Sequence, residues 1–259
     1  MKIGAIVQAR LSSIRLPQKV ILPLAGKPVL WHVLNRLQYC KELDTVILAT
    51  STHKEDRMLK DIADSLGVPT FFGSLGDVLS RYYHAASKYK LDVIVRITAD
   101  CPMIDPGIVD EVIDGFIKGN YDCYELSGAF PDGLDTSVYS FKALETAFRE
   151  AELPSFREHV GAGFFSGNKE RLKIGGYEKF KDKGNYRWTI DEPADYEFLK
   201  EVFRELYKEG KIFSSQDIFE LLSRKPQLLD VNSHIMRNEG LLKSLEEDKK
   251  YMATKGKRT

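Results

Sequence analysis

Three cationic side chains fall close together near the start of the chain. Arg10, Arg15 and Lys19 share a short stretch with the hydroxyl groups of Ser12 and Ser13. Arginine guanidinium groups bind phosphate oxygens through paired hydrogen bonds, and a lysine adds a point charge. This combination is typical of a site for a polyanion such as a nucleoside triphosphate. A solvated basic surface loop is the alternative, and no Walker A or G-x-G-x-x-G sequence decides between the two.

Two aspartates follow predicted strands elsewhere in the chain. Asp100 comes directly after the apolar run 93–98, and Asp191 closes a short predicted strand that begins near Arg187. Carboxylates at strand ends can hold a hard cation that keeps waters and takes phosphate oxygens. Each aspartate also has a structural alternative. Asp191 precedes a proline at a predicted helix start, where the default role of an aspartate is to cap the helix. For Asp100 the alternative is an aspartate that caps a helix or a turn. This role fits Asp105 better, since Asp105 leads into a predicted helix around 108–117.

Alternating strands and helices must position these groups. The pattern predicts strands at 2–8, 45–50, 68–72 and 93–98, and helices starting near residue 28 and covering 53–66 and 77–89. In the helix at 53–66, Met58 is expected to point inward. This alternation predicts an α/β fold with a doubly wound, mostly parallel sheet. Ligands bind outside the carboxyl ends of the strands in such folds, which is where the cationic loop and Asp100 lie.

The opening of the chain resembles a known family. Q-A-R-x-x-S-x-R-L-P-x-K at 8–19, followed by L-x-G-K-P, is similar to the start of sugar-nucleotide cytidylyltransferases. Within them it most resembles the spore-coat polysaccharide cytidylyltransferases, whose relatives activate 3-deoxy-manno-octulosonate and sialic-type acids as CMP derivatives. The resemblance implies a Rossmann-like fold of the nucleotide-diphospho-sugar transferase type. One departure is Gln18, where those proteins usually carry glycine.

The resemblance also implies roles for the polar residues. Asp100 and Asp191 would be ligands of Mg²⁺ and, together with Arg15 and Lys19, would form the catalytic set. The nucleotide would be bound by residues of the first loop and of the strand before Asp100: Gln8, Ala9, Arg10, Ser13, Arg15, Lys19 and Thr98.

The middle of the chain resembles the family through P-x-G-L-D-x-x-V and R-E-H-V. The resemblance implies that this stretch contacts the acceptor sugar, and the predicted acceptor-binding residues are Asp135, Arg157, His159 and Arg187. From the residues alone, R-E-H-V is better read as a helix end with an internal ion pair. Most relatives carry an acid where this chain has Ser137.

Composition narrows the class of protein. The 259 residues include 38 basic and 38 acidic side chains, and a zero net charge argues against a nucleic-acid or membrane-surface partner. The three cysteines have neither disulfide-framework nor zinc-site spacing. With no charged-then-apolar leader and no membrane-length apolar run, we expect a cytoplasmic protein. We expect a single domain over 1–259, with an acceptor-side insert at about 120–180 and a helical C-terminal segment at 211–259.

These observations predict an enzyme that transfers CMP from CTP to the hydroxyl of a small acidic sugar and releases pyrophosphate. No dedicated general base is evident, so deprotonation assisted by the metal is the working hypothesis. A different nucleotide, or a phospho-sugar or phosphonate acceptor, would keep the chemistry. A glycosyltransferase would need a D-x-D sequence, which is absent, and an inactive nucleotide-binding module stays open. A homodimer through the middle segment is implied by the resemblance; the aromatic residues there also suit a core.

Overall fold

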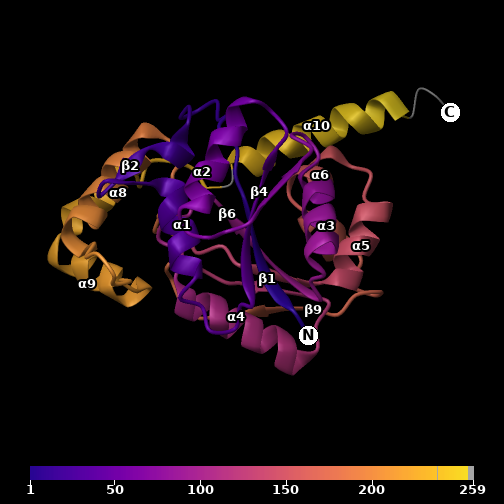
Figure 1. The fold of residues 1–259 in the computed structure, drawn as a ribbon, viewed down its shortest axis with the longest axis horizontal. Helices are drawn as coiled ribbons and strands as arrows, with labels where there is room; N and C mark the ends of the chain where they lie inside the picture. Colours follow the sequence, from indigo (N-terminus) through magenta and orange to yellow (C-terminus); the bar gives the residue numbers. More distant parts are fainter. Residues whose placement is uncertain (238, 256–259) are drawn as a thin grey trace.

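A seven-stranded sheet forms the centre of the computed structural model, which describes residues 1–237 and 239–255 (Figure 1). The strand order is β5-β4-β1-β6-β8-β7-β9. The strands are β1 (Ile3–Gln8), β4 (Thr45–Ser51), β5 (Thr70–Gly73), β6 (Val93–Thr98), β7 (Cys123–Leu126), β8 (Ser137–Ser140) and β9 (Ile174–Tyr177). A separate small hairpin consists of β2 (Pro23–Leu24) and β3 (Lys27–Pro28).

The sheet is parallel over the half that carries the first loop. Strands β5, β4, β1 and β6 pair in parallel, β8 runs antiparallel to both β6 and β7, and β9 is parallel to β7. The predicted α/β class with a mostly parallel sheet is therefore confirmed. Because β1 and β6 are neighbours in register, the loop after Gln8 and the turn after Thr98 leave the sheet side by side.

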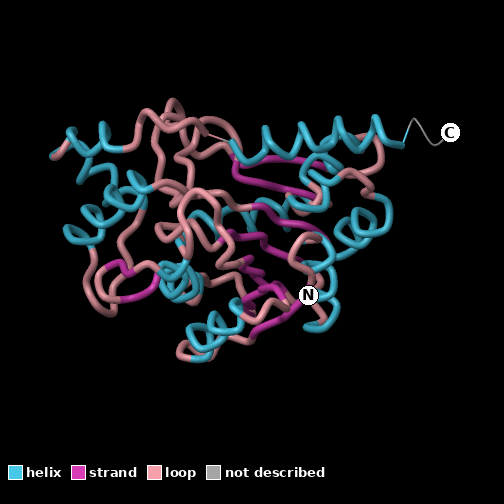
Figure 2. The backbone as a smooth tube through the Cα atoms, turned by 90° about the horizontal axis from the view of Figure 1, so that it is seen from above, coloured by secondary structure: helices cyan, strands magenta, loops and turns pink. Residues whose placement is uncertain are grey.

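Helices cover both faces of the sheet (Figure 2). One hydrophobic cluster joins the sheet to α1, α2, α4, α8 and α9, and the second joins it to α3, α5 and α7. The helices are α1 (Val29–Leu37), α2 (Leu59–Asp64), α3 (Val78–Tyr89), α4 (Pro106–Gly119), α5 (Phe141–Glu150), α6 (Pro154–Glu158), α7 (Ala162–Gly167), α8 (Pro193–Leu206), α9 (Ser215–Arg224) and α10 (Glu239–Lys255). Short 3-10 helices are η1 (Lys19–Ile21), η2 (Glu55–Met58) and η3 (Pro226–Val231).

Helix caps separate structural aspartates from those available for chemistry. Asp105 caps α4 through the backbone N–H of Gly107, as predicted. Helix α8 is instead capped by Glu192, which forms a capping box with Asp195, so Asp191 is not the cap. The strand predicted before Asp191 is wrong: only an isolated bridge between Arg187 and Asp132 forms there.

The helix predicted over 53–66 is divided. It consists of η2 followed by α2, and Met58 is 47% exposed rather than inward. Asp56 takes the buried position instead, where its carboxylate accepts hydrogen bonds from the backbone N–H of Leu11 and from the hydroxyl of Ser51. The polar contact with the first loop decides which side of this segment faces the protein.

The C-terminal helix α10 contacts the body of the protein through α6. Helix α10 runs across one side of the molecule against α6 (Figure 1), where Asp248 accepts hydrogen bonds from the backbone and hydroxyl of Ser155. In the middle segment, Phe130 and Tyr139 are buried in the core, while Tyr121 and Tyr124 stack on each other. None of the helices in the described residues is long and apolar enough to cross a membrane.

Candidate active site

The loop after β1 is fixed by hydrogen bonds from neighbouring segments. The hydroxyl of Thr50 donates to the carbonyl oxygen of Ala9 at 3.0 Å, and the backbone N–H of Leu11 donates to Asp56 at 2.8 Å. Both partners come from β4 and the segment behind it, which lie beside β1 in the sheet. The cationic loop is thus held by the sheet at its start.

Gln18 turns the end of this loop. Its backbone adopts a left-handed conformation (φ 58°, ψ 22°), and its N–H donates to the carbonyl oxygen of Leu11 at 3.2 Å. A residue with a Cβ costs roughly 1–2 kcal/mol there, which glycine avoids. The departure from the family pattern therefore falls at a position where glycine would be unstrained. The turn forms nevertheless, and Lys19 follows at the start of η1.

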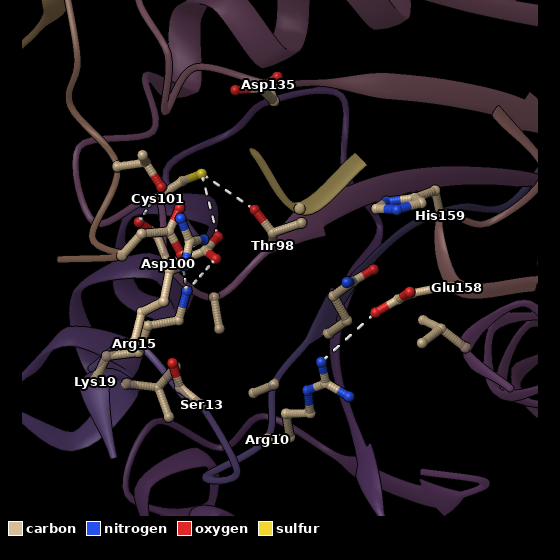
Figure 3. A pocket seen from close by; sticks show the side chains of 18 of the residues that line it. Arg10, Ser13, Arg15, Lys19, Thr98, Asp100, Cys101, Asp135, Glu158 and His159 are labelled. Atoms are coloured by element: carbon tan, nitrogen blue, oxygen red, sulfur yellow. Dashed lines mark hydrogen bonds and ion pairs between the residues drawn. The ribbon is translucent and has the colours of Figure 1, made fainter. Parts of the chain in front are cut away.

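Lys19 lies between the two aspartates singled out in the sequence. Its Nζ atom is 2.6 Å from Asp100 and 2.7 Å from Asp191 (Figure 3). Burial disfavours the charged forms, but the opposite charges prevail: they raise the pKa of Lys19, and Lys19 lowers the pKa of Asp100 to about 2. Lys19 and Asp100 are therefore both charged at neutral pH.

Two arginines complete what we call the paired cluster, which consists of Arg15, Lys19, Asp100, Arg187 and Asp191. Arg15 lies 3.0 Å from Asp191, and Arg187 lies 3.3 Å from the other oxygen of the same carboxylate. Arg187 is held in turn by Asp132 at 2.9 Å and by the fully buried Asp195 at 2.8 Å. Each cation of the paired cluster has a carboxylate partner within the protein.

The donor set fits a hard divalent cation. Asp100 and Asp191 are brought together by Lys19, although no group of three metal-ligating side chains occurs in the described part of the chain. Mg²⁺ usually keeps several waters and binds through one or two carboxylates plus substrate phosphates. Two carboxylates are therefore sufficient, provided that the ammonium group of Lys19 moves toward the phosphates.

A cavity of about 630 Å³ opens beside the paired cluster. Every predicted site residue except one lines it: Gln8, Ala9, Arg10, Ser13, Arg15, Lys19, Thr98, Asp100, Asp135, His159, Arg187 and Asp191. Figure 3 shows Thr98 between Asp100 and His159, with Asp135 on a separate side of the cavity. Segments far apart in the sequence thus meet in one pocket.

Arg157 is the exception. Its guanidinium group pairs with Asp77 at the start of α3 and donates to the carbonyl oxygens of Phe148 and Ala151. These contacts tie α6 to α3 and α5, and Arg157 is not part of the cavity wall. Its neighbour His159 does line the cavity, because the short helix α6 turns the two side chains in different directions.

Sequence reasoning missed two arginines in the cavity wall, which we call the unpaired arginines. Arg81 on α3 is 2% exposed, and its Nε and Nη1 atoms have no hydrogen-bond partner among the described residues. Arg96 on β6 has a buried Nε atom in the same condition. The available signal was the placement of each charge inside an apolar pattern, VIVRIT for Arg96 and an inward helix position for Arg81. The buried side-chain oxygen of Gln8 also lacks a partner.

The C-terminal helix contributes to the opposite wall of the cavity. The hydroxyl of Ser244 donates to Glu158 at 2.9 Å and lies 2.9 Å from Nε2 of His159. Glu158 also lies 3.7 Å from Arg10 of the first loop (Figure 3). Burial, together with the charge of Arg96, lowers the pKa of His159, so the ring is neutral at physiological pH.

Comparison with known proteins agrees with this geometry. A family model described as cytidylyltransferase matches residues 4–224. A cytidylyltransferase structure from Leptospira borgpetersenii serovar Hardjo-bovis is 34% identical, with a TM-score of 0.85 over 92% of this chain and 100% of that one. The spore coat polysaccharide biosynthesis protein SpsF of Bacillus subtilis is 31% identical over 85% of this chain and 94% of its own length. The 3-deoxy-manno-octulosonate cytidylyltransferase of Nitratidesulfovibrio vulgaris is 28% identical over 74% and 78%, respectively.

Proposed function

The chain belongs to the cytidylyltransferase family and is a CTP-dependent nucleotidyltransferase, and we propose that it transfers CMP from CTP to the hydroxyl of an acidic sugar. Pyrophosphate is the second product. The observation that carries the proposal is the paired cluster beside the cavity, where Arg15, Lys19, Asp100 and Asp191 meet from three distant segments. The relatives named for 3-deoxy-manno-octulosonate transfer and for spore coat polysaccharide support an acidic sugar destined for a surface polysaccharide or glycan.

The first loop would bind the triphosphate. In the reaction a sugar hydroxyl attacks the α-phosphorus, and the bond to the pyrophosphate oxygen breaks. Phosphoryl-type transfer asks a protein mainly for positioning and for neutralisation of charge. Arg15 and Lys19 are placed to exchange their carboxylate partners for β- and γ-phosphate oxygens, and Arg10 and Ser13 line the same side of the cavity. They would stabilise the leaving pyrophosphate.

Asp100 and Asp191 would hold a divalent cation, which we propose is Mg²⁺. When bound, such an ion neutralises phosphate charge and favours ionisation of a coordinated hydroxyl. The carboxylate of Asp100 is already ionised in the folded protein, since Lys19 holds its pKa at about 2. The chain's own contribution is therefore a pair of charged ligands in fixed positions.

The remaining wall residues divide between nucleoside and acceptor. Gln8, the backbone of Ala9, Thr98 and the unpaired Arg81 would contact the base and ribose, because they lie at the ends of β1 and β6 and on the adjoining α3. Asp135, His159 and Arg187 would lie on the acceptor side. We further propose that the enzyme acts in the cytoplasm, and a homodimer stays a prediction that sedimentation analysis would check.

Pyrophosphate release tests the proposal. Each of the four nucleoside triphosphates is supplied with Mg²⁺ and a panel of sugar acids, phospho-sugars and phosphonates. CTP-selective release that depends on a sugar acid would support the proposal and identify the acceptor. Release with a phosphorylated acceptor would show that the acceptor is not a sugar acid but would leave the nucleotidyl transfer in place. Failure to bind CTP at all would contradict the proposal.

A further inference from the structure

Arg96 is a partly buried cation, and its buried Nε atom has no hydrogen-bond partner among the described residues. It lies in the interior of β6, where Tyr82, Tyr139 and the carboxylates of Asp135 and Asp100 act on its charge from a distance. Buried charges in proteins are normally paired, because leaving water without compensation is costly. An arginine on a cavity wall whose Nε atom lacks a hydrogen-bond partner can bind an anion that enters the cavity.

The neighbours of Arg96 in the sheet bring no negative charge directly against it. Its register partners are Ile6 on β1 and Ser137 on β8, neither of which is acidic. The carboxylates of Asp135 and Asp100 act on its charge, as does that of Glu125, the register partner of Ser137 on β7, yet no ion pair joins Arg96 to any of them. Among the described residues, no carboxylate lies at ion-pair distance from the guanidinium group.

Arg96 lies on β6 close to the residues that we propose bind the phosphates of CTP. Side chains two residues apart on a strand share one face, so Arg96 and Thr98 point to the same side of β6, about 7 Å apart along the strand. Thr98 lies next to Asp100 in the cavity (Figure 3). Arg96 therefore lies on the same face of β6 as Thr98 and two residues further from Asp100, which we propose holds the metal ion on the phosphates.

The chemistry of the acceptor requires an anion site at such a place. In sugar acids of the ulosonic type, the carbon that carries the reacting hydroxyl also carries the carboxylate. The carboxylate must then bind close to the α-phosphorus and cannot be held by a distant residue. Arg157 is tied to Asp77, and Lys19 and Arg187 each hold two or more carboxylates already.

We propose that Arg96 binds the carboxylate of the acceptor and selects sugar acids over neutral sugars. This inference rests on the proposed function and adds to it the residue that recognises the acid. A guanidinium group matches a carboxylate with two parallel hydrogen bonds, which gives orientation as well as affinity. Binding would give the buried Nε atom of Arg96 the partner that it lacks among the described residues.

Ser137 offers a test that leaves Arg96 in place. Because Ser137 is the register partner of Arg96 on β8, the variant Ser137→Glu would put a carboxylate next to the guanidinium group. This internal carboxylate would compete with that of the acceptor. Ser137→Gln has nearly the same size without the charge and is the matched control for crowding.

The experiment measures pyrophosphate release with 3-deoxy-manno-octulosonate, N-acetylneuraminate and the methyl esters of both. In Arg96→Gln we expect KM for the acids to rise by about 10- to 100-fold, the range for a lost charge-assisted hydrogen bond. KM for CTP and for the esters should change by less than about 3-fold, since neither uses this contact. Ser137→Glu should behave like Arg96→Gln, and Ser137→Gln should stay near the wild type.

Several results would overturn the inference while leaving CMP transfer intact. One is an unchanged preference for acid over ester in Arg96→Gln; another is a rise in KM for CTP as large as that for the acid, which would place Arg96 on a phosphate. Transfer to neutral or phosphorylated acceptors alone would also overturn it. If Arg96→Gln does not fold, Ser137→Glu and Ser137→Gln decide. Absence of CTP binding in the wild type would instead overturn the proposed function, and this inference with it.

Discussion

The paired cluster and the unpaired arginines lie on the wall of one cavity but differ in whether their positive charges are neutralised within the protein. In the paired cluster, each cation already has a carboxylate, and Asp191 alone receives Lys19, Arg15 and Arg187. Arg81 and Arg96, by contrast, have buried nitrogen atoms without a partner in the described chain. The paired cluster is stable without a ligand and must exchange partners when one binds. The unpaired arginines lack that compensation until a ligand supplies it.

This difference indicates two kinds of preorganisation. A paired cation is held in position by a group that the substrate or metal later replaces, so its loss should affect both stability and rate. An unpaired cation stores an unfavourable desolvation, so its removal should weaken binding while leaving the free protein as stable as before, or more stable. Four measurements would test this difference between the two groups of residues.

The largest effect is expected at the two aspartates. Asp100→Asn and Asp191→Asn should each lower kcat by about 1,000-fold, because a neutral amide is a poor ligand for the divalent cation that neutralises the triphosphate. Steady-state kinetics measure the effect, and thermal unfolding checks that the variants fold. Asp114→Asn, an exposed aspartate paired with Lys118, is the matched control. Near-normal rates in both variants would remove these carboxylates from the mechanism.

The second largest effect on the rate is expected at Lys19. Lys19→Met keeps the length of the side chain but removes the charge that we assign to the leaving pyrophosphate. We expect a loss of about 2–4 kcal/mol of transition-state stabilisation, by comparison with deleted oxyanion donors. The measurement is kcat/KM for CTP, with the exposed Lys118→Met as control. An unchanged kcat/KM would indicate that the first loop is a solvated basic surface loop and does not bind the triphosphate.

The pH dependence of stability tests the pairing itself. In the wild type, the pKa of Asp100 is about 2, below its ordinary value of 3.8, so the unfolded chain takes up the proton first as the pH falls. The stabilisation from this carboxylate is complete above about pH 4 and is lost as the pH falls toward 2, by roughly 2 kcal/mol.

Lys19→Met should reverse this dependence. Burial of Asp100 remains while its main counter-charge is gone, so its pKa should rise above the unfolded value. Stability attributed to Asp100 would then fall as the pH rises through about 4. Urea unfolding of both proteins at about pH 3 and pH 6 measures the two slopes. Parallel curves would mean that Lys19 does not set the charge of Asp100.

The smallest effect is expected at Arg81. Arg81→Gln should raise KM for CTP by roughly 10-fold, because the buried guanidinium group is proposed to meet the nucleoside. The free protein should unfold within about 1 kcal/mol of the wild type, since the lost group has no hydrogen-bond partner at Nε or Nη1. The comparison would fail if the variant were destabilised as strongly as one that breaks a buried ion pair, by about 3 kcal/mol or more.

Much of the fold and part of the site could be predicted before the structure. The alternation of apolar strands and amphipathic helices predicts the parallel half of the sheet, and Asp77 and Asp105 cap the expected helices. The boundaries failed where a tertiary contact decided the local structure. At 53–66, the hydrogen bonds of Asp56 to Leu11 and Ser51 turn the segment so that Met58 is exposed.

The sequence by itself determined which charged segments follow which strands, and this was enough to predict the meeting of the first loop with Asp100. The partner of each charge was decided only by the tertiary structure. Arg157 lies two residues before His159 yet binds Asp77, whereas the buried Nε atom of Arg96, inside an apolar strand, has no partner among the described residues. The reason is physical: pairing depends on which strand ends converge and on the face from which a side chain leaves its backbone, and both are set by the packing of segments distant in the chain.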